Sequence, residues 1–158
     1  MKFPENFKVV PVGNYLDISG TVYTDSINMK GYHAAAFLIQ IGTLGTASAT
    51  LTVQSGAADA TYTTPETFDY AFAGAAATAA NCDVLADSAS AATLALTHGT
   101  YSDHMLVVEI DASAMTEGQE WLALKFVEGS SGTGNVTVFA ILEPRYTGNR
   151  SATAVHNV

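Results

Sequence analysis

Basic residues are missing from the whole middle of this chain. Its 158 residues include six Lys and Arg against fifteen Asp and Glu, which gives a formal net charge of −9. No Lys or Arg lies between Lys30 and Lys125, a stretch that carries most of the carboxylates. Because nucleic-acid binding depends on clustered basic side chains, we expect no nucleic-acid partner. The acidic middle indicates a solvated surface. Alternatively, the basic termini dock onto an acidic neighbouring protein.

Charged residues of either sign are scarce. They make up 13% of the chain, whereas hydrophobic residues make up 48%. Average proteins carry roughly 25% charged residues. A surface with so few charges gives little protection against association. We therefore expect a protein that works within an assembly.

The chain also lacks paired cysteines and long apolar runs. Its one cysteine, Cys82, excludes an intrachain disulfide, and without a neighbouring base it is more typical of a small buried or neutral residue than of a nucleophile. No apolar run approaches the roughly 20 residues that span a bilayer. The N-terminal sequence MKFPENFKVVPVG lacks the apolar core of a signal peptide. We expect a soluble protein made in a cytoplasm, with no membrane partner.

Motifs of reactive sites are absent as well. The sequence contains no Gly-x-Ser-x-Gly elbow, phosphate loop or dinucleotide fingerprint. His98 and His104 flank Asp103, but no third zinc ligand stands at a recognisable spacing. Glu109 and Asp111 share one strand face, as paired catalytic carboxylates can, but outward residues of an amphipathic strand give the same pattern. We expect no enzymatic activity, no cofactor and no metal.

What the chain does contain is a series of strand patterns separated by turn residues. We predict about eight or nine strands, and their segments are 8–12, 16–24, 34–41, 48–54, 68–72, 92–97, 105–111, 121–127 and 136–142. This spacing predicts an all-β single domain, either a sandwich or a barrel. In 136–142 both sets of alternate residues are largely apolar, so we expect this strand to be covered on both faces.

The predicted domain spans residues 8–147. An arm precedes it, a tail follows it, and an Ala-rich segment lies within it. Residues 1–7 form an N-terminal arm, in which Phe3 and Phe7 follow neither a helical nor a strand period. Residues 148–158 form a C-terminal tail. Residues 56–92 are rich in Ala, but polar residues interrupt every helical face, so we predict mostly loop apart from the strand at 68–72.

In the order of its segments, the chain resembles a class of small virion proteins of tailed phages. The resemblance rests on DSINMKGYHAAAFLIQIG at 25–42, LVVEID at 106–111 and ILEPRY at 141–146, and it spans about residues 8 to 147. It implies a capsid decoration or cement protein with a jelly-roll-like β-sandwich. Such proteins are commonly homotrimers on the capsid exterior. The implied partners are therefore the major capsid protein and further copies of this chain, in a virion assembled in a host cytoplasm.

A cement protein stabilises a shell because it binds the assembled form in preference to the dissociated one. Under this hypothesis Phe3 and Phe7 anchor the arm, and Arg145 and Arg150 meet acidic groups of a neighbouring subunit. The alternatives are a minor tail or head-fibre base protein and a carbohydrate-binding β-sandwich module. The missing signal sequence and the sparse aromatic residues count against the last of these.

Overall fold

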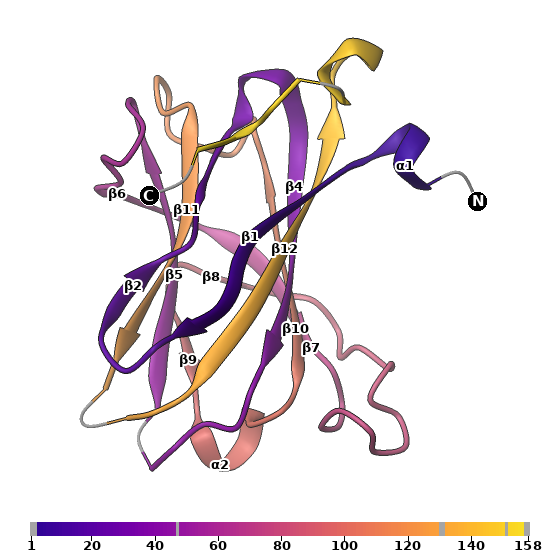
Figure 1. The fold of residues 1–158 in the computed structure, drawn as a ribbon. Coiled ribbons are helices and arrows are strands. Elements are labelled where there is room, and N and C mark those ends of the chain that lie inside the picture. The colour runs from indigo at the N-terminus through magenta and orange to yellow at the C-terminus, as the bar shows by residue number, and fades with distance from the viewer. Residues whose placement is uncertain (1–2, 47, 130–131, 151, 157–158) are drawn as a thin grey trace.

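Two antiparallel sheets packed face to face form the protein (Figure 1). The computed structural model describes residues 3–46, 48–129, 132–150 and 152–156, with the side chains of residues 149, 150 and 156 left undescribed. The expected all-β sandwich is confirmed. Short helical turns lie at its ends: α1 (Phe3–Asn6), η1 (Met29–Gly31), α2 (His98–Tyr101) and η2 (Thr147–Arg150).

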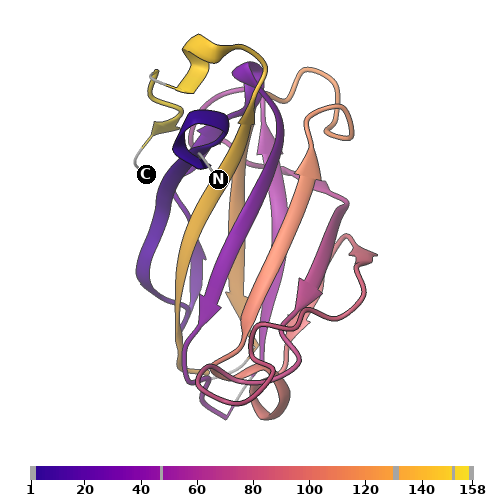
Figure 2. The ribbon, with the colours of Figure 1, turned by 90° about the vertical axis from the view of Figure 1, so that its right-hand side faces the viewer.

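The six-stranded sheet has the order β1-β12-β4-β10-β7-β8. Its strands are β1 (Lys8–Asp17), β4 (Tyr32–Ile41), β7 (Phe68–Phe72), β8 (Ala89–Ala91), β10 (Met105–Asp111) and β12 (Asn135–Pro144). The long strands β4 and β12 lie side by side near its centre, and β10 flanks β4. Figure 2 shows this sheet from its outer side.

The seven-stranded sheet has the order β13-β3-β11-β5-β6, with β2 also paired to β11 and β9 to β5. Its strands are β2 (Thr21–Tyr23), β3 (Ser26–Asn28), β5 (Ala49–Gly56), β6 (Thr64–Glu66), β9 (Leu94–Leu96), β11 (Trp121–Glu128) and β13 (Val155–His156). The chain passes repeatedly between the sheets, so that β1, β12, β4 and β10 face β3, β11, β5 and β6. This is the strand order of a jelly roll.

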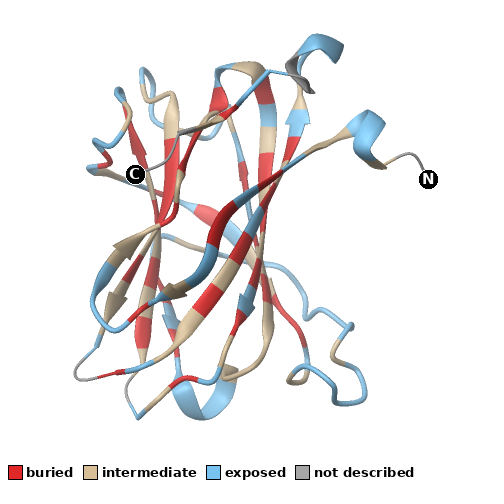
Figure 3. Cartoon of the chain, viewed as in Figure 1, coloured by how far each residue is buried: buried red, intermediate tan, exposed pale blue. Residues whose placement is uncertain are grey.

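The core lies between the sheets and follows the period of two along the strands (Figure 3). From the six-stranded sheet, Phe37 and Ile39 of β4 and Val108 of β10 point inward and are fully buried. From the opposite sheet, Leu51 of β5 and Phe126 of β11 are equally buried. Side chains from both sheets thus form one continuous apolar layer.

Most predicted strands agree with the structure, but one segment was wrong. Residues 16–24 were expected to form a single strand. Instead β1 continues to Asp17, and a separate strand β2 begins at Thr21. The register of β1 on β12 shifts twice beyond Pro11, and Tyr15 has a positive φ of 52°. These irregularities let β1 continue across residues 13–15, between the two segments that were predicted as separate strands.

Residues 56–92 contain more strand than predicted. Besides β7, the segment includes β6 and β8, each three residues long. The connection between β7 and β8 is held by backbone hydrogen bonds, among them Gly74 N–H to the Val84 carbonyl at 2.8 Å and Ala77 N–H to the Asp103 carbonyl at 2.8 Å. Strands this short leave too little periodicity to be recognised in sequence.

The turn after β5 is tied to β3 by a polar cluster. Ser26 donates a hydrogen bond of 2.7 Å to Asp59, and the Tyr62 hydroxyl donates one of 3.1 Å to the same carboxylate. Burial raises the pKa of Tyr62, so its hydroxyl remains a donor at neutral pH. Gly56 has to lack a side chain here, because a Cβ would lie 1.8 Å from the Thr61 carbonyl oxygen.

A buried carboxylate joins the connection between β10 and β11 to the seven-stranded sheet. Glu66 of β6 is 4% exposed and accepts hydrogen bonds from the Ser55 hydroxyl at 2.5 Å and the Thr116 amide at 2.9 Å. A buried carboxylate is tolerated when donors satisfy it in this way. Glu66 is therefore a structural residue.

Replacing Glu66 tests this assignment. We expect Glu66→Ala to lower the free energy of unfolding by about 1–3 kcal/mol, because it removes the acceptor of the buried Ser55 hydroxyl and of the Thr116 amide. Glu66→Gln keeps one carbonyl oxygen as acceptor and should cost less. Urea unfolding followed by circular dichroism measures both. Equal stability of the two variants and the wild type would contradict the assignment.

Candidate interaction surface

The outward side of the six-stranded sheet, called here the outer face, is unexpectedly apolar. Alternate residues of β12 point to opposite sides, and Val138 and Leu142 are fully buried while Phe139 is 44% exposed. The expectation that 136–142 is covered on both faces was therefore wrong. Its second set of apolar residues, including the half-buried Ile141, lies on the outer face instead.

One line of outward residues crosses the sheet at right angles to its strands. Strand register places them directly opposite one another from β1 to β7. This apolar row consists of Pro11, Phe139, Leu38, Val107 and Ala71. Single exposed apolar residues are ordinary, but a contiguous set marks a surface that contacts something else.

Carboxylates gather on the outer face beside this row. They form an acidic rim of Asp69, Glu109, Asp111 and Glu143, all four exposed. Glu109 of β10 stands directly opposite Asp69 of β7. Like charges in directly opposite positions destabilise a sheet. Within the described residues, no Lys or Arg forms an ion pair with any carboxylate of the rim.

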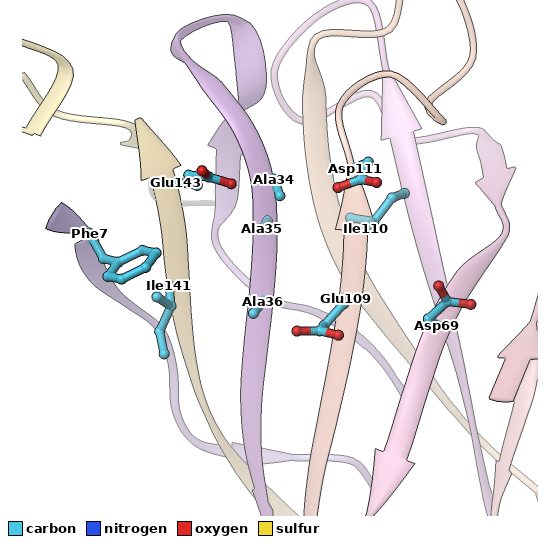
Figure 4. Close-up of a pocket in the computed structure, with 10 residues that line it drawn as sticks. All are labelled: Phe7, Ala34, Ala35, Ala36, Asp69, Glu109, Ile110, Asp111, Ile141 and Glu143. Carbon is cyan, nitrogen blue, oxygen red and sulfur yellow. The ribbon is translucent and has the colours of Figure 1, made fainter. Parts of the chain in front are cut away.

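An open hollow of about 290 Å³ lies between the carboxylates (Figure 4). Ala34 and Ala36 of β4 form its floor, because their small side chains leave room between the neighbouring strands. The carboxylates of Glu143 and Glu109 extend from either side toward β4. Phe7 stands over Ile141 at the end of the hollow toward the N-terminus. The hollow is thus apolar at its floor and acidic at its sides.

The N-terminal arm stands on the same side of the sheet (Figure 2). Within the arm, Phe3–Asn6 form α1, none of which is buried, and the Phe7 amide donates a hydrogen bond of 3.0 Å to the Phe3 carbonyl. The rings of Phe3 and Phe7 lie 5.2 Å apart between centroids. No helical period was expected for Phe3 and Phe7, and this was wrong. The two residues have the i, i+4 spacing that brings side chains together on a helix.

Arg145 lies at the end of β12 and is engaged within the chain. Its Nε donates a hydrogen bond of 2.8 Å to the Tyr32 carbonyl, and its amide donates one of 2.9 Å to the Gly31 carbonyl. These bonds tie the exit of β12 to the start of β4. The side chain of Arg150, the second cation expected to meet a neighbour, lies outside the described residues.

The C-terminal tail is not free along its whole length. Val155 and His156 pair with Ile27 and Ser26 as strand β13, and Ala154 is 5% exposed. The Asn28 amide donates a hydrogen bond of 2.9 Å to the Ala154 carbonyl. Val155 and His156 therefore belong to the seven-stranded sheet.

Other kinds of site receive no support from the part of the chain that is described. No three His, Cys, Asp or Glu residues there are placed to hold a metal ion, the acidic rim included. His98 begins α2, and Nδ1 of His104 lies 2.8 Å from the Ser102 carbonyl oxygen. Over the same residues, no helix has the length and apolar character to cross a membrane.

The fold is a jelly-roll sandwich, and its outer face combines an apolar row with an acidic rim. No protein-family model matches the sequence, and no curated protein matches it significantly. Among solved structures, the chain is similar to the SPBc2 prophage-derived protein YomS. The TM-score is 0.50 at 12% identity, over 87% of this chain and 92% of that one. At this identity the likeness shows a shared fold alone.

Two weaker likenesses concern an empty capsid of Triatoma virus and an arabinose-bound MgGH51 α-L-arabinofuranosidase. The capsid chain has a TM-score of 0.39 at 12% identity, over 98% of this chain and 97% of that one. The enzyme has a TM-score of 0.30 at 13% identity, over 96% of this chain and 24% of that one. Scores this low carry no argument about function.

Two substitutions in β12 test which residues face outward. Leu142→Ala should lower the free energy of unfolding by about 2–5 kcal/mol, because it opens a cavity in the core. Phe139→Ala should cost about 1 kcal/mol or less, as substitutions outside the core usually do. Chemical denaturation of both variants measures the difference. An equal loss in the two would place Phe139 in a covered environment and contradict the outer face.

Proposed function

We propose that this chain is a structural protein of a tailed-phage particle, which binds the outside of the capsid and stabilises it as a decoration protein. The observation that carries the proposal is the outer face, where an apolar row crosses the exposed side of a rigid sheet. Such a surface suits a partner that buries it. The low charge content and the resemblance of segments 25–42, 106–111 and 141–146 to phage virion proteins support the same role.

The fold is compatible with this role. A prophage-derived protein, YomS, has a similar fold over most of both chains. A jelly roll presents the outward side of a whole sheet on a small scaffold. Because the surface is preformed, this protein loses little conformational entropy when it binds.

Stabilisation requires no chemistry of the chain itself, so the proposal includes no enzymatic activity. A protein that binds the assembled shell and not the dissociated subunits shifts the equilibrium toward the shell by its binding free energy. At a free concentration 100 times Kd this amounts to about 2.7 kcal/mol per site. Many copies on one particle add their contributions.

The proposal predicts that the protein is present in purified particles. Particles of the phage that encodes the chain should be banded, separated into heads and tails, and analysed by quantitative mass spectrometry. We expect the chain in the head fraction at many copies per particle. Recovery with tails would indicate a tail or fibre-base role instead, and absence from both fractions would refute a virion role.

Removing the arm should weaken binding to capsids. We expect a variant that lacks residues 1–7 to bind heads at least several-fold more weakly, since the aromatic pair Phe3 and Phe7 stands on the outer face. Sedimentation with heads that were assembled without the protein measures occupancy. A fold check by circular dichroism serves as control, and unchanged occupancy would exclude the arm as an anchor.

A further inference from the structure

We infer that the outer face binds a different protein, by a segment that places an apolar strip on the apolar row and a lysine or arginine side chain in the hollow. This inference deepens the proposed function and rests on it, because the partner would be the shell protein of the capsid. It is carried by three features of the same surface: the apolar row, the acidic rim and the hollow between them.

The apolar row defines the direction of the partner segment. Its residues follow the strand register, so an apolar strip laid on them would cross the strands of the sheet. Phe139 at 44% exposure and Val9 at 47% are exposed large apolar side chains of this face. Aromatic residues in such positions are common anchors of protein interfaces.

The acidic rim defines the charge of the partner. The opposed pair Glu109 and Asp69 is unfavourable in the free protein, since like charges repel across neighbouring strands. Ser90 donates a hydrogen bond to Asp69 but brings no positive charge. A basic side chain from outside would relieve this repulsion and gain an ion pair. Complementary charge therefore selects a basic partner over a neutral or acidic one.

The hollow defines the shape of the basic group. Its floor of Ala34 and Ala36 is apolar, and carboxylates stand at both sides (Figure 4). Lysine and arginine have an apolar stem and a charged end, so the stem can lie over the alanines while the end reaches Glu109 or Glu143. A larger residue at Ala36 would fill the space that the stem needs.

A second copy of this chain fits the same surface poorly. A two-fold contact would bring the acidic rim of one copy against the identical rim of the other. Three of the basic side chains that are described have contacts away from the acidic rim. Lys30 pairs with Glu120 at 3.5 Å, Lys125 lies 5.7 Å from the centre of the Tyr23 ring, and Arg145 binds the Tyr32 carbonyl. A different protein supplies the required charge more readily.

Two variants of the outer face test the inference on heads assembled without the protein. Glu109→Lys reverses one charge of the rim and places a cation opposite Asp69, so it should fold at least as stably as the wild type. Phe139→Ser removes the aromatic side chain of the apolar row. We expect each variant to bind at least tenfold more weakly, measured by titrating fluorescently labelled protein onto heads and sedimenting them.

Two controls make a charge reversal and an apolar-to-serine change away from the outer face. Glu117→Lys makes the same charge reversal in the exposed connection between β10 and β11, and Val127→Ser removes a half-buried apolar side chain from β11 of the opposite sheet. Both should bind as the wild type does. Thermal unfolding confirms that every variant is folded, and light scattering gives its oligomeric state.

The possible results separate the two proposals. If the wild type does not bind heads, the proposed function fails and the inference falls with it. If the wild type binds and the outer-face variants bind equally well, only the inference is overturned. If the controls lose binding as much as the outer-face variants, the effect is not specific to this surface and the inference also fails. Dissociation of a wild-type oligomer by the outer-face variants would show a contact between copies and overturn the choice of partner.

Discussion

The alternation of side chains along β12, β4 and β10 is the constraint on which this structure depends. Each strand has a period of two, and one side must enter a core that excludes water. Burying Val138 and Leu142 therefore directs Phe139 and Ile141 outward, although all four are apolar. The same register that closes the core creates the apolar row on the opposite side of the sheet.

The outer face combines features that are costly for an isolated protein. Exposed apolar side chains lie side by side, and Glu109 stands opposite Asp69 without a described cation to separate them. The core does not require either feature, since outward positions accept neutral polar residues. The partner inferred above would bury the apolar row and neutralise the acidic rim.

Much of the fold could be predicted from the sequence, because its long strands are strongly patterned. The segment 105–111 was predicted to the residue, and 34–41 and 121–127 to within two residues. The short strands β3, β6, β8 and β13 were not predicted, since two or three residues carry no measurable period. Glu109 and Asp111 were recognised as sharing a face, but Asp69 and Glu143 were not connected with them.

The sequence by itself determined the class of the protein: an all-β domain, sandwich or barrel, with little charge, an acidic middle and no motif of a reactive site. These are properties of composition and local period, which act over a few residues. Only the tertiary structure decided which apolar set of β12 is buried, and that strands distant in sequence place four carboxylates around two alanines. The reason is that strand order and register depend on pairing between remote segments, and no local pattern encodes it.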